Sequence, residues 1–197
     1  FVNVGYPLDA EGLLICELDG AAAEVQHQIE KLRLILDKNN AIQVRVATDA
    51  AERMQLWLGR KAAFPAVGRL APDYYCMDGT IPRSELAAVL AQITKFSEQH
   101  GLDVANVFHA GDGNLHPLIL YDANKAGEIE RAEAFGADIL NLCIEVGGTI
   151  TGEHGVGVEK IDQMCIQFTP EELELFHGVK SAFDESRILN PGKAVPT

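Results

Sequence analysis

Three of the six histidines lie in two glycine-rich segments, and imidazole is a common metal ligand. His109 and His116 enclose the sequence His-Ala-Gly-Asp-Gly-Asn-Leu-His, whose Asp-Gly pair is typical of a two-residue hairpin turn. Such a turn sets His109 directly opposite His116 on one face of two paired strands, with Cβ atoms about 4.5–5.5 Å apart. The spacing therefore predicts that both imidazoles bind one cation.

A cation held by two neutral histidines needs further ligands, and a carboxylate is a common third. Glu153, in Gly-Glu-His-Gly at 152–155, is the candidate, because five glycines between Gly147 and Gly157 let this backbone approach another element closely. The adjacent His154 is then available to face a substrate. Two histidines and one carboxylate suit Zn, Mn, Fe or Co, and the residues do not choose among them.

Other chemistries find less support in the sequence. The run at 111–116 begins like a dinucleotide-binding fingerprint but ends in histidine where glycine is required. The chain also contains neither a P-loop nor a Gly-x-Ser-x-Gly nucleophile motif. Two alternatives stay open: a non-haem iron oxygenase, which uses the same ligand types, and a non-catalytic cap or docking domain, in which the glycine-rich segments are only turns.

Composition limits the class of protein. The 197 residues are 47% hydrophobic with a formal net charge of −13, which predicts a folded core and no nucleic-acid partner. No apolar run approaches the roughly 18 residues of a membrane span. The four cysteines form no C-x-x-C pair, which favours reduced thiols and a cytoplasmic location. Any attachment to a membrane is expected to run through partner subunits. The chain starts at Phe1, as a fragment would.

Apolar periodicity predicts the elements that position these residues. Strands are expected at 12–18, 42–47, 74–81, 104–109 and 116–121, and helices at 25–36, 49–61, from 82, at 126–146 and from 170. Thr169, Pro170 and Glu172 form a capping box at the start of the last helix. The order predicts an α+β fold, with a mostly antiparallel sheet covered by helices and a helical C-terminal segment. A weak β-α-β rhythm suggests two similar subdomains.

Three segments resemble a known family: HAGDGNLHP at 109–117, TGEHGVGVEK at 151–160 and ILNPGK at 188–193. They are similar to the C-terminal domain of FAD-linked oxidases of the vanillyl-alcohol-oxidase type, which include the glycolate oxidase flavin subunit, D-lactate dehydrogenase and D-2-hydroxyglutarate dehydrogenase. Residues 63–83 most resemble the glycolate oxidase branch. The resemblance covers nearly all of residues 1–197 and implies two ferredoxin-like halves, with an N-terminal FAD-binding domain absent from this chain.

The resemblance also implies roles for residues at the first two motifs. It makes His109 and His116 the metal-binding histidines, Glu153 the metal-binding glutamate and His154 the catalytic base. Relatives that act on 2-hydroxyglutarate carry a lysine at the position of Cys76. The resemblance therefore implies that this chain binds a second substrate carboxylate less well.

Four further positions follow from the same resemblance. Arg60 is expected to hold the substrate carboxylate with help from Arg69, and Asn190 and Lys193 are expected near the flavin. The implied activity is that of an FAD-dependent D-2-hydroxy acid dehydrogenase or oxidase of the glycolate or D-lactate type. Its cofactors would be FAD, bound mainly by the missing domain, and a divalent metal, Zn or Mn first. The partners would be a small 2-hydroxy acid, the flavin-binding domain and further subunits of an oligomer. Without the flavin-binding domain, the fragment is expected to be inactive and colourless.

Overall fold

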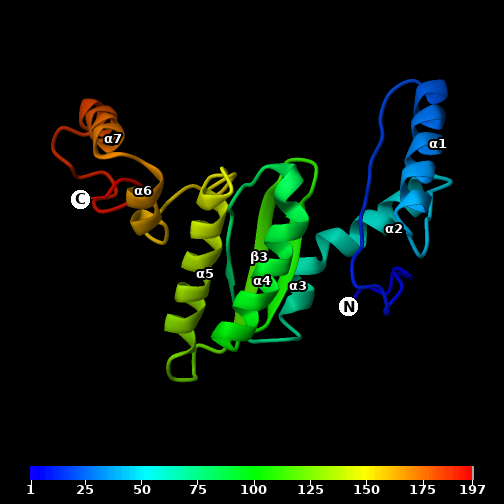
Figure 1. Cartoon of the computed structure of the whole chain (residues 1–197), viewed down its shortest axis with the longest axis horizontal. Helices are drawn as coiled ribbons and strands as arrows, with labels where there is room; N and C mark the ends of the chain where they lie inside the picture. Colours follow the sequence, from blue (N-terminus) through cyan, green and yellow to red (C-terminus); the bar gives the residue numbers. More distant parts are fainter. Residues whose placement is uncertain (197) are drawn as a thin grey trace. The chain divides into compact units, whose positions relative to one another are not determined.

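The computed structural model describes residues 1–196, and the chain divides into two compact units, Phe1–Ala66 and Val67–Thr197. Figure 1 shows the elements in chain order. They are α1 (Ala22–Lys38), α2 (Ala50–Lys61), α3 (Ala63–Val67), β1 (Asp73–Cys76), a 3₁₀ turn (Arg83–Glu85), α4 (Leu86–His100), β2 (Val104–His109), β3 (Asn114–Tyr121), α5 (Glu128–Glu145), α6 (Ile161–Gln167) and α7 (Pro170–Phe183).

The first unit contains the two predicted helices but not the two predicted strands. Residues 12–18 and 42–47 form no strand in the described part of the chain. Their apolar side chains are largely in solvent, with Leu14 61% and Ile42 86% exposed. Alternating hydrophobicity favours a strand only where one face is covered and the backbone has a pairing partner, and neither condition is met here. The structure therefore does not show two ferredoxin-like halves.

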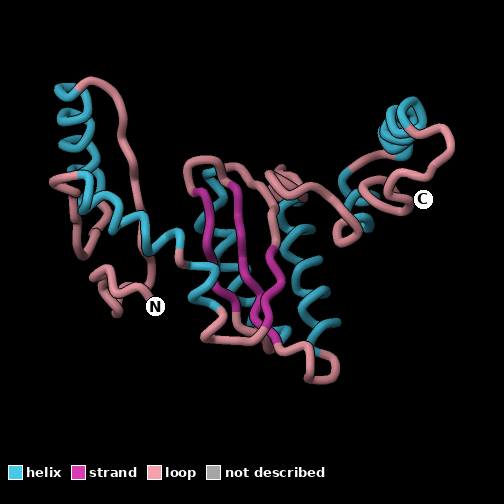
Figure 2. The backbone as a smooth tube through the Cα atoms, turned by 180° about the vertical axis from the view of Figure 1, so that it is seen from behind, coloured by secondary structure: helices cyan, strands magenta, loops and turns pink. Residues whose placement is uncertain are grey.

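A three-stranded antiparallel sheet forms the centre of the second unit, in the order β1-β3-β2. This confirms the predicted antiparallel pairing. Helices α4 and α5 cover one face of the sheet, as Figure 1 and the reverse view in Figure 2 show. Because β3 is the central strand, it is paired on both edges, and its residues from Asn114 to Leu120 are buried.

The two faces of β3 have different partners. Leu115 and Ile119 point into the hydrophobic core, where they join Ile93 of α4 and Phe135 and Ile139 of α5. Successive side chains of a strand point to opposite faces, so the even-numbered residues of β3 face away from these helices. The core thus fixes the strand that presents His116 on the opposite face.

The last helix begins as predicted. Thr169 Oγ1 accepts a hydrogen bond from the Glu172 amide at 3.3 Å, and the Glu172 carboxylate accepts one from the Thr169 amide at 2.8 Å. The short helix α6 was not predicted, and α7 contains no buried residue. No described helix is long and apolar enough to cross a membrane.

Candidate functional site

The hairpin between β2 and β3 has a longer turn than the sequence suggested. The amides of Asp112 and Gly113 both donate to the carbonyl of His109, at 3.1 and 3.0 Å, and four residues separate the strands. His109 therefore pairs with Asn114, so the predicted pairing of His109 with His116 was wrong. Gly113 has a φ of +72° and lies against the Ile81 carbonyl, where a side chain would clash.

The two histidines nevertheless share a face of the hairpin. His116 pairs with Val107, two residues before His109. A shift of two residues preserves which side each side chain takes, whereas a shift of one would have reversed it. The imidazoles lie on the diagonal with ring centroids 5.4 Å apart.

Glu153 completes the predicted ligand set. The ligand atoms of His109, His116 and Glu153 all lie within 4.8 Å of one another. Glu153 oxygens lie 3.8 Å from His109 Nε2 and 3.7 Å from His116 Nε2, too far for hydrogen bonds. One cation with ligand bonds of about 2.1 Å spans such separations. The three side chains therefore fit a divalent cation.

The environment of His116 favours the neutral imidazole that binds metals. Its side chain is only 4% exposed, and burial lowers its pKa against the raising effects of the Met77 carbonyl and the Glu153 carboxylate. Nδ1 lies 3.4 Å from the Met77 carbonyl, which can only accept, so Nδ1 carries the proton. The Nε2 lone pair is then left for a ligand on the Glu153 side.

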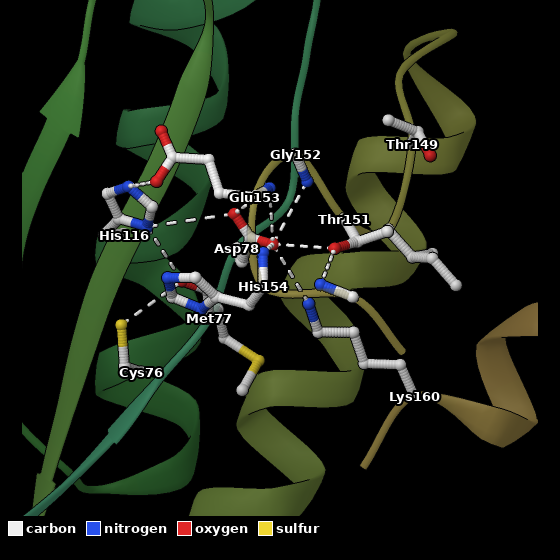
Figure 3. A network of polar contacts seen from close by, with 12 residues as sticks. Cys76, Met77, Asp78, His116, Thr149, Thr151, Gly152, Glu153, His154 and Lys160 are labelled. Carbon is white, nitrogen blue, oxygen red and sulfur yellow. Dashed lines mark hydrogen bonds and ion pairs between the residues drawn. The ribbon is translucent and has the colours of Figure 1, made fainter. Parts of the chain in front are cut away.

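His154 lies next to His116. Its exposed ring stacks on His116 with centroids 5.2 Å apart and an interplanar angle of 13°. Cys76 Sγ lies within 4.8 Å of ligand atoms of both rings, and burial raises the pKa of this thiol to about 11. Figure 3 shows the two rings with Cys76 beside them. His154 is thus outside the group of His109, His116 and Glu153, but with Cys76 and His116 it forms a second group of possible ligands that shares His116 with the first.

A buried carboxylate that the sequence reasoning missed supports the segment bearing Glu153 and His154. Asp78 is fully buried, and its Oδ2 accepts from Thr151 Oγ1 at 2.7 Å and from the His154 amide at 2.7 Å. Lys160 Nζ lies 3.4 Å away (Figure 3). Burial raises the pKa of Asp78, but these hydrogen bonds and Lys160 outweigh burial and hold the pKa well below its usual range. A carboxylate within the apolar run 74–81 was the available signal.

The remaining predicted residues lie outside this cluster. Arg60 is half-buried in the last turn of α2 in the first unit, and Arg69 is exposed between α3 and β1. Asn190 and Lys193 are exposed in the segment after α7, where the Lys193 amide donates to the Asn190 carbonyl at 3.3 Å. Their expected contacts with substrate and flavin remain predictions.

Comparison with known proteins gives a consistent set of relatives. The model of the family "FAD linked oxidases, C-terminal domain" matches residues 2–194. The chain is 60% identical over 197 residues to the glycolate oxidase subunit GlcD of Escherichia coli K12, covering 100% of this chain and 40% of that protein. It is 37% identical over 193 residues to the Bacillus subtilis GlcD subunit, covering 98% of this chain and 41% of the other.

A more distant relative and a solved structure extend this set. Identity is 30% over 185 residues to the mitochondrial D-lactate dehydrogenase [cytochrome] of Arabidopsis thaliana, covering 93% of this chain and 33% of that protein. The structure of 4-ethylphenol oxidase from Gulosibacter chungangensis superposes with a TM-score of 0.63 at 21% identity, over 90% of this chain and 38% of the other, which shows a shared fold. The chain therefore spans well under half the length of these proteins.

Proposed function

The chain belongs to the family of FAD linked oxidases, C-terminal domain, and from this membership we propose that it is the substrate- and metal-binding part of an FAD-dependent 2-hydroxy acid dehydrogenase or oxidase. A glycolate or D-lactate type of substrate is the best supported, because the relatives carry those names. The convergence of His109, His116 and Glu153 is the observation that carries the proposal.

These three residues would hold a divalent metal, with Zn or Mn preferred among the metals that suit this ligand set. When bound, such a metal acts as a Lewis acid on the hydroxyl and carboxylate oxygens of the substrate. His116 contributes a buried neutral imidazole, while His109 and Glu153 are about half exposed, so the ligand set faces solvent on one side. A small anionic substrate can therefore reach it, although the chain as a whole is acidic.

His154 is proposed as the general base that takes the substrate hydroxyl proton, a role typically worth about 10²- to 10⁴-fold in rate. Its exposed ring stacks on His116, outside the proposed group of His109, His116 and Glu153. Arg60, assisted by Arg69, is proposed to pair with the substrate carboxylate in a charge-assisted hydrogen bond. Loss of the proton to His154 prepares the α-carbon to lose a hydride.

A bound flavin supplies the acceptor for that hydride. We assign the flavin mainly to a domain outside this chain, because the relatives are more than twice as long as their matched part. Asn190 and Lys193 are proposed to approach the flavin from the segment after α7. The four free cysteines agree with a reducing compartment, and we propose the cytoplasm.

The metal role is tested with two single variants of the intact protein, His109→Ala and His116→Ala. Both variants should lose bound metal, measured by elemental analysis, together with turnover of glycolate and D-lactate. His27→Ala, in an exposed position of α1, is the matched control and should retain both. Retention of metal and turnover by both His109 and His116 variants would eliminate the metal role.

The base role needs a separate variant. His154→Ala should lower turnover by about 10²-fold or more while leaving the metal content unchanged. Unchanged turnover would remove His154 as the base. Oxygen- and 2-oxoglutarate-dependent turnover without flavin would instead favour the iron oxygenase alternative.

A further inference from the structure

The Asp78 carboxylate accepts hydrogen bonds from four donors of the 151–154 segment. Besides Thr151 Oγ1 and the His154 amide, its Oδ2 accepts from the amides of Gly152 at 3.1 Å and Glu153 at 3.0 Å. We infer that Asp78 is a positioning residue, which fixes Glu153 and His154 at the distance from β3 that the proposed chemistry requires. This inference rests on the proposed function.

The backbone of Asp78 is itself anchored to the strand that bears His116. The Met77 amide donates to the Pro117 carbonyl at 3.1 Å, and the Gly79 carbonyl accepts from the Leu115 amide at 2.9 Å. The Asp78 carbonyl also accepts from the Gly152 amide at 2.9 Å. Its two neighbours therefore join this stretch to β3, while the backbone and side chain of Asp78 itself bind the 151–154 segment.

The hydrogen bonds explain why two neighbouring side chains reach different parts of the site. Three consecutive amides, from Gly152 to His154, point at one carboxylate, which forms an anion-binding turn of the backbone. With the backbone held this way, the Glu153 carboxylate lies within 4 Å of both hairpin histidines. His154 instead stacks on His116, and Figure 3 shows Glu153 and His154 on different sides of that ring. Rotation of this backbone would move both side chains together.

The turn also needs a residue without a side chain at its start. A Cβ atom on Gly152 would lie 2.6 Å from Thr80 Oγ1 and 2.8 Å from the Asn114 amide group. Both neighbours belong to paired backbone, since Thr80 forms isolated bridges with Asn114 and Thr149. The segment is therefore packed against β3 by close contact as well as by the Asp78 hydrogen bonds.

Lys160 is the countercharge of this arrangement. Its side chain is 3% exposed and lies 3.4 Å from Asp78 Oδ2. Replacing Asp78 alone would leave the buried charge of Lys160 without a partner, which is strongly destabilising in its own right. A test of positioning must therefore remove the lysine charge first.

The experiment uses the intact protein in a Lys160→Met background, with Asp78→Asn and Asp78→Ala added separately. Hydrogen exchange of peptides covering 149–160 reports whether the amides are held, and competition with a chromophoric chelator reports Zn²⁺ affinity. Lys160→Met alone should keep the loop protected, because four donors still reach Asp78. Asp78→Ala should speed exchange in 149–160 at least about tenfold while α5 stays protected.

The Zn²⁺ dissociation constant should rise about 10- to 100-fold in Asp78→Ala, the usual effect of losing a residue that orients metal ligands. The Zn²⁺ dissociation constant of Asp78→Asn should lie between those of Lys160→Met alone and Asp78→Ala, because neutral hydrogen bonds replace charge-assisted ones. Asp184→Asn is the matched control, since Asp184 is also buried and accepts from Lys180 Nζ at 3.1 Å and from the Ile188 and Leu189 amides. It should change neither exchange in 149–160 nor Zn²⁺ affinity.

Two results would overturn the inference. One is wild-type exchange in 149–160 in the Asp78→Ala variant, and the other is an equal loss of protection in α5, which would make Asp78 a residue of general stability. Failure of the proposed function looks different. A wild-type protein that binds no Zn²⁺ or Mn²⁺ removes the metal role, while the exchange data still decide whether Asp78 holds the segment.

Discussion

The two units of the chain differ in how much of their apolar surface is buried. Neither α1 nor α2 in the first unit contains a buried residue, although both carry an apolar stripe. In the second unit α5 alone buries six residues, and the sheet and helices enclose a continuous core. All residues of the candidate metal cluster lie in the second unit.

This difference indicates where a binding site can be held rigidly. Ligands on elements fixed by a core keep their separations, which a metal site requires. Helices with no buried face depend on local signals such as caps and ion pairs. The predictions below test this contrast, from the largest expected effect to the smallest.

The largest effect is expected from a core substitution in α5. Phe135 is fully buried against α4 and the sheet, so Phe135→Ala should lower the free energy of unfolding by about 3–5 kcal/mol. Leu34→Ala in α1 is the counterpart at a site 70% exposed and should change it by no more than about 0.5 kcal/mol. Urea denaturation followed by circular dichroism measures both. Similar losses in the two variants would contradict the contrast.

Glycines in the two units should respond oppositely to alanine. Gly152→Ala forces a Cβ against Thr80 and Asn114 and should destabilise by about 1–3 kcal/mol, with weaker metal binding. Gly12 has open space around it, so Gly12→Ala should be neutral or stabilise by up to about 1 kcal/mol. Thermal unfolding compares the two. A neutral Gly152→Ala variant would show that the segment has room to adjust.

Thiol reactivity should separate the cysteines by environment. Burial raises the pKa of Cys143 to about 12 and that of Cys76 to about 11, so both remain protonated near neutral pH. Cys16 and Cys165 are exposed. Titration with a chromogenic disulfide reagent at pH 8 should therefore label two thiols rapidly and the other two only on unfolding. Rapid labelling of Cys143 would show that the core opens on the timescale of the reaction.

The smallest effect is expected at the start of α2. The Thr48 amide, Arg45 and the Thr48 hydroxyl lower the pKa of Glu52 to about 2. A lowered pKa stabilises the folded form above the unfolded pKa of about 4.3, and the contribution is lost as the pH falls through about 2. A carboxyl titration by NMR should show this low midpoint, and Glu52→Gln should remove the pH dependence of α2 in this range. A midpoint near 4 would show that the hydrogen bonds from Thr48 and Arg45 to the Glu52 carboxylate are not formed.

Much of the second unit is predictable because its signals are local. Thr169, Pro170 and Glu172 lie within four residues, so the start of α7 follows from neighbours alone. The helix predicted at 126–146 likewise forms, as α5 (Glu128–Glu145). The strands expected at 12–18 and 42–47 had suitable patterns, yet a strand needs a partner that the pattern itself does not contain.

The sequence alone determined the candidate ligand residues, the shared face of His109 and His116, and the family motifs. The face was predicted despite the wrong register because strand geometry alternates, and a displacement of two residues leaves the alternation unchanged. Only the tertiary structure decided that Asp78 meets a segment more than seventy residues later, through a carboxylate that accepts hydrogen bonds from four donors of that segment. Such a contact depends on how the residues after β1 pack against the 151–154 segment, because no local signal links positions so far apart in the chain.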